Sequence, residues 1–241
     1  MAICSFERIE KKYMMDEDQY RAFINAVAEE LAVDDYGLHT ICNIYFDTEH
    51  NDLISRSIEK PVYKEKLRLR SYGIPDRDSP VFLEIKKKYD GIVYKRRVEM
   101  TLREAERYLA TGIRNEGMDQ QIMREIDYFM RSCHPQAKQF IAYDRIAMYG
   151  IHDSRIRLTI DQNIRGRRED LYLEHGSFGR RILPEGMYLM EIKVPGAMPV
   201  WLARILSEMQ IRPVSFSKYG NAYKQWMAGQ HAEAGQLKKA Q

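Results

Sequence analysis

The sequence predicts an antiparallel α+β fold whose sheet closes into a β-barrel. Several segments alternate charged with apolar residues at the two-residue period of a strand, and neighbouring segments are joined by short turn signals. Helical segments lie between groups of strands, as in antiparallel α+β proteins. Closure of the sheet would remove its exposed edges and turn the charged faces toward a common lumen.

The N-terminal part begins with a strand over Phe6–Tyr13. Asp16 is a candidate N-cap for a helix over Asp16–Leu31, in which apolar residues recur at helical spacing. Four strands follow, and the Asp90-Gly91 dipeptide between the last two is a strong signal for a two-residue hairpin. These strands are predicted over His39–Thr48, Val62–Tyr72, Pro80–Asp90 and Gly91–Thr101.

The C-terminal half contains both kinds of element. Helix-forming residues over Leu102–Cys133 are interrupted at Gly112–Gly117, which predicts two helices. Further helices are expected over Pro199–Met209 and Tyr219–Met227. Strand patterns return at Lys138–Tyr149, Ser154–Arg165 and Met187–Pro195.

Length and composition favour one domain. The chain has 241 residues, of which 44% are hydrophobic, so we expect a single domain over residues 1–228 and a flexible tail over residues 229–241. Because 38 basic and 35 acidic side chains leave a net charge of only +3, an anion site requires segregated charge. No run of residues is long and apolar enough to cross a membrane, and the cysteines lack CxxC spacing, which together indicate a cytoplasmic protein. The cysteines are Cys4, Cys42 and Cys133.

Several predicted strands carry one strongly charged face. In the segment KEKLRLRS the cations Lys64, Lys66, Arg68 and Arg70 leave one side of the strand and the leucines leave the other. A solvated outer face explains such alternation in any single strand, but four cations on one face repel one another unless an anion lies between them. The same alternation groups Glu10 with Lys12, Glu84 with Lys86 and Lys88, Arg155 with Arg157, Thr159 and Asp161, and Glu191 with Lys193.

These residue types suit a triphosphate and a divalent metal. Arginine and lysine bind phosphoryl oxygens, whereas carboxylates bind Mg²⁺ or Mn²⁺, which bridge phosphates to the protein. The sequence contains no Walker GxxxxGK[ST] loop, no kinase glycine-rich loop and no GxGxxG. We therefore expect a nucleotide to be held by side chains in a tunnel.

Nine short segments, in this order between about Phe6 and Tyr223, resemble those of a known family: RIEKKY, IYFDT, KLRLRSYG, FLEIKKK, YKRR, YDRIAM, RLTID, MEIKVPGAMPVWL and SFSKYG. The chain resembles the VTC domain, the polyphosphate polymerase domain of the vacuolar transporter chaperone family, in its stand-alone bacterial form. That family belongs to the triphosphate tunnel metalloenzyme, or CYTH-like, superfamily. The resemblance implies a closed tunnel of about eight antiparallel strands with flanking helices, which transfers the γ-phosphoryl group of ATP to a growing polyphosphate chain.

The resemblance also implies which residues act. The phosphate ligands it implies are Lys12, Arg68, Arg70, Lys86, Lys95, Tyr143, Arg145, Ser217 and Lys218, and the charged strand faces add Lys66, Arg157 and Lys193. The catalytic set is Arg68, Arg70, Lys86, Arg145, Lys218 and Glu191. Glu191 is the implied metal ligand, with help from Glu10 and Glu84. Lys95, Ser217 and Lys218 come from the resemblance alone.

Other functions stay open at this point. Water in place of polyphosphate would make the protein a triphosphatase, and the related CYTH group includes nucleotidyl cyclases. A third alternative is a module that binds polyphosphate without making it. Ser215 replaces a lysine of the fungal polymerases, which weakens the expected grip on a long product. We expect ATP and polyphosphate as ligands and a membrane protein on another chain as a candidate partner. We expect no nucleic acid, because the basic strands lack interleaved aromatics for base stacking.

Some conspicuous residues are given structural roles. The six histidines have no metal-ligand spacing. Asp47 is expected to orient a basic residue or cap a turn, and Trp201 is expected to pack in a helix. Arg165, Arg167 and Arg168 are placed in a loop, where they are solvated or guide anions.

Overall fold

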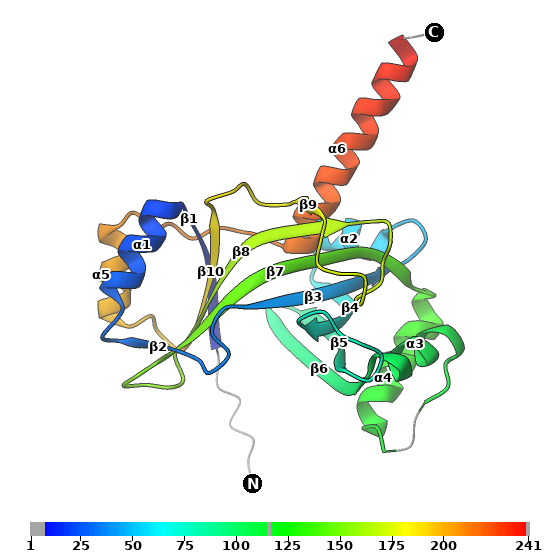
Figure 1. The fold of residues 1–241 in the computed structure, drawn as a ribbon, viewed down its shortest axis with the longest axis horizontal. Coiled ribbons are helices and arrows are strands. Elements are labelled where there is room, and N and C mark those ends of the chain that lie inside the picture. The colour runs from blue at the N-terminus through cyan, green and yellow to red at the C-terminus, as the bar shows by residue number, and fades with distance from the viewer. Residues whose placement is uncertain (1–7, 115–116, 240–241) are drawn as a thin grey trace. The chain divides into compact units, whose positions relative to one another are not determined.

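Most strands belong to one antiparallel hydrogen-bonded sheet (Figure 1). A computed structural model describes residues 8–114 and 117–239. The strand order is β1 (Arg8–Met15), β10 (Tyr188–Pro195), β8 (Arg157–Arg167), β7 (Gln136–Gly150), β3 (His39–Asp47), β4 (Tyr63–Tyr72), β5 (Pro80–Tyr89) and β6 (Ile92–Thr101). Each of these corresponds to a predicted strand, so the antiparallel α+β class is confirmed. Within the described strands β1 and β6 end this order and do not pair with each other, so the ladder is not closed as predicted.

Two short strands were not predicted. β2 (Leu31–Val33) pairs with β7, and β9 (Arg180–Arg181) pairs with β8. The sequence pattern instead extends the first helix to Leu31, because the apolar side chain of that residue also fits a helical period. In the structure Leu31 stands opposite Gly150 in the sheet and is buried there.

Helix boundaries follow local capping signals. α1 (Glu17–Ala26) begins after Asp16, whose side chain accepts a hydrogen bond from the backbone N of Gln19 in a capping box. α3 (Leu102–Thr111) ends at Gly112, which has the left-handed conformation that favours glycine, and α4 (Gln120–Cys133) follows. These helices confirm the interruption predicted near Gly112.

Other helices depart from the predicted boundaries. α2 (Asp52–Ile58) was not predicted, because seven residues are too few to show a helical period. α5 (Val200–Glu208) agrees with the predicted range. α6 (Lys218–Lys239) continues past the predicted end at Met227, through residues expected to form a flexible tail. The described part of the chain contains no helix that is both long enough and apolar enough to span a membrane.

The chain forms two compact units, and β7 and β8 contribute residues to both. Unit 1 comprises Met1–His39, Tyr143–Ile164 and Leu183–Phe216. Unit 2 comprises Thr40–Ala142, Arg165–Ile182 and Ser217–Gln241. The single domain expected over residues 1–228 stays a prediction.

The core of unit 1 lies between its strands and two helices. α1 and α5 lie side by side (Figure 1). Phe23 of α1 and Leu202 of α5 are fully buried in one cluster. Met190 and Ile192 of β10 are buried in the same cluster, whereas Glu191 between them faces the other way. Burial of each large apolar side chain contributes about 1.5–3 kcal/mol, which holds the charged residues of β10 on the opposite face.

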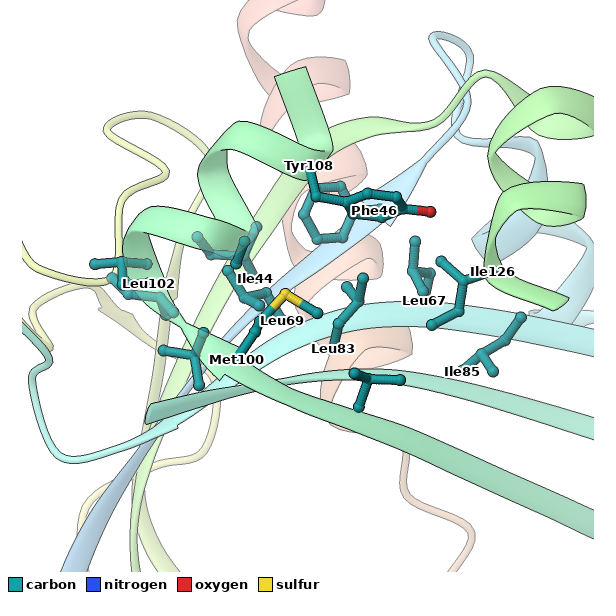
Figure 2. Packing of buried hydrophobic residues seen from close by; sticks show 14 of the residues in the cluster. Ile44, Phe46, Leu67, Leu69, Leu83, Ile85, Met100, Leu102, Tyr108 and Ile126 are labelled. Carbon is teal, nitrogen blue, oxygen red and sulfur yellow. The ribbon is translucent and has the colours of Figure 1, made fainter. Parts of the chain in front are cut away.

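The core of unit 2 packs α3 and α4 against one face of the β3–β4–β5–β6 meander. Figure 2 shows Leu67 of β4 and Leu83 of β5 next to Tyr108 of α3 and Ile126 of α4. All four are buried. The alternating leucines of KLRLRS therefore face the helices, and the cations between them face the opposite side of the sheet.

Candidate phosphate-binding site

Unit 2 presents cations in register across three strands. Lys66 of β4 stands opposite Lys86 of β5, and Lys86 stands opposite Lys95 of β6. Lys64 and Lys88 form a second directly opposed pair. Like charges at opposed positions destabilise a sheet, so this face is suited to an anion that would relieve the repulsion.

Glu84 is the buried centre of this cationic face. Its Oε2 lies 2.6 Å from Arg68 Nη2 and 3.8 Å from Arg70 Nε, and its Oε1 lies 2.8 Å from Lys95 Nζ. Burial alone would raise the pKa of the Glu84 carboxyl, but Arg68, Arg70 and Lys95 outweigh it and lower the pKa to about 2. The ionised Glu84 thus positions three of the predicted phosphate ligands. These contacts favour a structural role for Glu84 over the metal role predicted for it.

Two residues of β3 help to orient the arginines. Arg68 Nη1 donates to the hydroxyl of Tyr45 at 3.1 Å, and Arg70 Nε donates to Oδ1 of Asn43 at 3.0 Å. Asn43 is fully buried and donates to a carbonyl of β7. Neither Asn43 nor Tyr45 was predicted to be a site residue. Their alternate spacing in NIYFD, opposite KLRLR, is the signal that identifies them.

The start of α6 adds a hydroxyl and an aromatic ring to unit 2. Ser217 Oγ accepts from Lys66 Nζ at 3.5 Å, and the same ammonium lies 5.9 Å from the ring centroid of Tyr219. Tyr219 donates to Oδ2 of Asp47 at 2.9 Å, and its pKa is raised first by burial and then by this carboxylate. Asp47 also accepts from two backbone N–H groups at the start of α2, so its predicted structural role is confirmed.

Unit 1 carries a second charged face, centred on Glu191. Glu191 Oε1 lies 2.7 Å from Lys193 Nζ, and Oε2 lies 3.7 Å from Lys12 Nζ. Lys12 Nζ also donates to the carbonyl oxygen of Phe216 at 3.1 Å, because Val214 hydrogen-bonds to the backbone of β1 at Lys12. The carboxylate of Glu191 therefore holds two cations that were predicted to bind phosphate.

Arg145 is fixed on this face by Asp161. The pair has two contacts, 2.6 Å between Nε and Oδ1 and 2.8 Å between Nη2 and Oδ2. Burial alone would lower the pKa of Arg145, but Tyr143, Asp161 and Glu191 together raise it, so the guanidinium stays charged. The Tyr143 ring centroid lies 5.1 Å from Arg145 Cζ. The bidentate anchor Asp161 was predicted on the same face but not included among the site residues.

Thr159 lies on β8, between the strands that carry Glu191 and Arg145. It stands opposite Glu191 in the β8–β10 ladder. Its hydroxyl is buried and has no hydrogen-bond partner within the described residues. A buried hydroxyl without a partner is costly, so its presence beside Glu191 indicates a group available to an additional ligand.

The donor set of unit 1 fits a metal that is completed by substrate oxygens. Within residues 8–114 and 117–239 no three or more His, Cys, Asp or Glu residues gather as a metal cluster. Mg²⁺ is commonly held by one or two carboxylates together with phosphate oxygens and water. Glu191 fits this pattern, and Glu10, exposed opposite Lys193, is the neighbouring carboxylate on β1.

Arg165 and Arg167, which were predicted in a loop, lie at the end of β8, whereas Arg168 lies in the connection after this strand, as predicted. Arg167 is sandwiched between the rings of Phe140 and Phe178, 3.6 and 4.1 Å from their centroids. Its N–H groups donate to the backbone carbonyls of Asp170, Tyr172, Gly176 and Phe178. Arg165 donates to Ser177. These contacts show that the two arginines organise the connection after β8.

One further structural expectation is confirmed, since Trp201 packs against the core of unit 1. Among the described residues Cys42 and Cys133 form no disulfide, and Cys4 lies outside the described residues.

The predicted phosphate ligands are divided between the two units. Unit 1 contains Lys12, Tyr143, Arg145, Arg157 and Lys193. Unit 2 contains Lys66, Arg68, Arg70, Lys86, Lys95, Ser217 and Lys218. Ser215, which is exposed, belongs to unit 1.

Comparisons with known proteins find several solved structures that are similar to this chain. A candidate adenylate cyclase from Bacillus halodurans is 15% identical, with a TM-score of 0.54 over 87% of this chain and 93% of its own. A candidate adenylate cyclase from Vibrio parahaemolyticus is 13% identical, with a TM-score of 0.47 over 90% of this chain and 97% of its own. A candidate adenylyl cyclase from Hippeastrum, described as having a dominant triphosphatase activity, is 15% identical, with a TM-score of 0.46 over 88% of this chain and 93% of its own.

The similarity to the Bacillus protein shows a shared fold, which by itself assigns no activity. A comparison with curated proteins finds no match. The model of one family, described as the VTC domain, matches residues 7–227. Because this match covers most of its length, the chain belongs to the VTC domain family.

Proposed function

We propose that this protein is a metal-dependent polyphosphate polymerase that uses ATP. The observation that carries the proposal is the row of opposed cations Lys66, Lys86 and Lys95, beside Arg68 and Arg70, on a chain of the VTC family. A polyanion with regularly spaced charges is the ligand that such a row fits best. The cations of unit 1 support the same ligand class.

The roles of the residues follow from their anchoring. Glu84 and Asp161 hold Arg68 and Arg145 at fixed positions, so these guanidiniums need little reorganisation when a phosphoryl group binds. Lys86 and Lys218 would add point charges for the bound phosphates. Positioning and charge neutralisation of this kind are the main demands of phosphoryl transfer.

The reaction needs no covalent intermediate on the protein. A terminal phosphate oxygen of the polyphosphate chain forms a bond to the γ-phosphorus of ATP. The bond between that phosphorus and the β–γ bridging oxygen breaks, and ADP leaves with the electron pair. Because the attacking phosphate is already ionised at neutral pH, no dedicated general base is required.

Glu191, with Glu10 as the neighbouring carboxylate, would hold the divalent metal. When bound, the ion would neutralise charge that develops on the transferred group. Lys193 and Lys12 flank Glu191 and would keep the phosphate oxygens next to this carboxylate. Thr159 lies opposite Glu191 and would donate its hydroxyl hydrogen to the same substrate.

One assay separates the candidate activities. Purified protein is incubated with ATP and Mn²⁺ or Mg²⁺, and polyphosphate, free phosphate and cyclic nucleotide are resolved. Long polymer is the expected product. Free phosphate alone would replace the proposal with a triphosphatase, and cyclic nucleotide would replace it with a cyclase. Tight polyphosphate binding without turnover would leave only a binding module.

A pair of variants tests the residue roles. Glu191→Gln should abolish turnover and still unfold at a temperature close to that of the original protein. Arg103→Gln, which removes an exposed charge on α3, should leave turnover unchanged. Full activity of Glu191→Gln would contradict the metal role assigned to this residue.

A further inference from the structure

An apolar tip with cations on either side ends the β4–β5–β6 meander. The turn segment KKKYDGIVYKRR, residues 86–97, contains six cationic residues and one acidic residue around an apolar centre. We define the meander tip as the residues Val62, Tyr63, Tyr89, Ile92, Val93 and Tyr94. Their exposed fractions lie between 46 and 64%, which is high for large apolar side chains. They form a group contributed by three neighbouring strands.

The strand register places some of these side chains on one face of the meander and the rest on the other. Tyr63 stands opposite Tyr89, and Tyr89 stands opposite Ile92, so these three share the face that further along the strands packs on α4. Val93 stands opposite Lys88 on the other face. A flat protein partner would cover one face of the meander. An apolar tip exposed on both faces is better matched to a medium that surrounds it.

The cations next to the tip indicate the charge of that medium. Lys64 and Lys88 are directly opposed. Burial, then Lys88 and then Lys60 lower the pKa of Lys64, so these three lysines lie close together. The acidic neighbours are partly engaged, since Glu65 accepts from the hydroxyl of Tyr63 at 2.9 Å. Tyrosine and lysine are typical of membrane interfaces. Tyrosine rings lie at the level of the lipid headgroups, and lysine side chains reach anionic lipids.

We propose that the meander tip docks on the surface of an anionic lipid bilayer, with Tyr89, Ile92 and Tyr94 at the boundary of headgroups and acyl chains. Lysines on both strands next to the tip then contact lipid phosphates. A second copy of the chain is a poorer occupant, because antiparallel pairing of two whole β6 strands would bring Lys95, Arg96 and Arg97 of each copy together. This inference goes beyond the proposed catalytic function and does not depend on it.

Sedimentation with vesicles tests the proposal on the whole chain. The protein should sediment with vesicles of phosphatidylcholine and phosphatidylglycerol and should not sediment with phosphatidylcholine alone. A triple variant, Tyr89→Ser, Ile92→Ser and Tyr94→Ser, should lower the partition coefficient between water and vesicles by at least about tenfold. The reason is that the variant lacks three large apolar side chains whose transfer from water into the bilayer favours binding. The matched control Tyr36→Ser, at an exposed tyrosine of unit 1, should bind as the original protein does.

Two further measurements separate docking from capture of lipid phosphate by the candidate phosphate site. Excess inorganic tripolyphosphate should weaken vesicle binding less than the triple variant does, because it competes for Lys64 and Lys88 and not for the apolar tip. The emission of an Ile92→Trp variant should shift to shorter wavelength with anionic vesicles, because the indole enters a less polar layer. The triple variant should retain the thermal shift that tripolyphosphate induces, which shows that it is folded.

Several results would overturn the proposal. The first is that the protein sediments with neither kind of vesicle. The second is binding that tripolyphosphate abolishes and the triple variant leaves unchanged, which would assign the lipid contact to the phosphate site. The third is a dimer in the absence of lipid that the triple variant converts to a monomer, which would assign the tip to self-association.

Discussion

Asp161 accepts hydrogen bonds from Arg145 with both carboxylate oxygens, and its carboxylate is almost fully buried. Removal of one partner from a buried pair leaves an uncompensated charge and costs about 3–5 kcal/mol. We expect Asp161→Ala to lower the free energy of unfolding in urea by this amount. Asp153→Ala removes an equivalent two-point pair with Arg155 on the exposed surface and should cost much less. Equal losses in the two variants would contradict a special role for the buried pair.

Glu84 should make the stability of the protein depend on acid pH. Its folded pKa of about 2 is below the ordinary value of 4.5, so its contribution is present above pH 4.5 and is lost as the pH falls toward 2. We expect urea unfolding to show this loss in the original protein and a weaker pH dependence in Glu84→Gln. Parallel curves for the two proteins between pH 4.5 and 2 would exclude the ion-paired carboxylate as the cause.

The opposed lysines Lys66 and Lys86 should link stability to anion binding. Replacement of both by glutamine removes repulsion, so the midpoint of thermal unfolding without ligand should stay the same or rise. The rise in this midpoint that inorganic tripolyphosphate produces in the original protein should shrink in the double variant, because two proposed phosphate ligands are gone. Lys11→Gln, an exposed change on the other face of β1, provides the control for loss of positive charge. A full response of the double variant to tripolyphosphate would remove these lysines from the site.

Thr159 should show opposite effects on stability and binding. Thr159→Val keeps the shape of the side chain and removes a buried hydroxyl that has no partner among the described residues, so the free energy of unfolding should rise by about 1 kcal/mol or more. Affinity for tripolyphosphate, measured by calorimetry, should fall. Thr159→Ser retains the hydroxyl and should keep most of the affinity. A Val variant that is stabilised but binds normally would limit Thr159 to a structural role.

Glu106 of α3 should destabilise the protein near neutral pH. Burial, and then the neighbouring carboxyl of Glu174, raise its pKa, whereas Arg77 opposes the shift. A raised folded pKa gives a contribution that is complete below the unfolded pKa and is lost as the pH rises through the folded value. We therefore expect Glu106→Gln to be more stable than the original protein at pH 7 and to lose that advantage near pH 4. The same difference at both pH values would show that titration of this pair is not responsible.

Strand periodicity accounts for what could be predicted about the fold. Alternation in KEKLRLRS and LMEIK separates core from charged face without reference to neighbours, because successive side chains of a strand point to opposite sides. The hairpin at Asp90-Gly91 was likewise predictable, since both residues have positive φ as a two-residue hairpin of this kind requires. Short elements such as α2 and β2 carry too few residues to show a period.

The sequence by itself determined which residues are charged, which strand faces carry them, and to which family the nine motifs point. Only the tertiary structure decided how each charge is used, because ion pairs depend on register between strands that lie far apart in the sequence. Glu84 and Glu191 have similar local patterns, EIK in both cases. In the structure Glu84 is buried among Arg68, Arg70 and Lys95, whereas Glu191 keeps part of its carboxylate exposed beside Lys193 and Lys12. Burial and the number of cationic neighbours favour a structural role for the first carboxylate, whereas the second is the one to which we assign the proposed metal role.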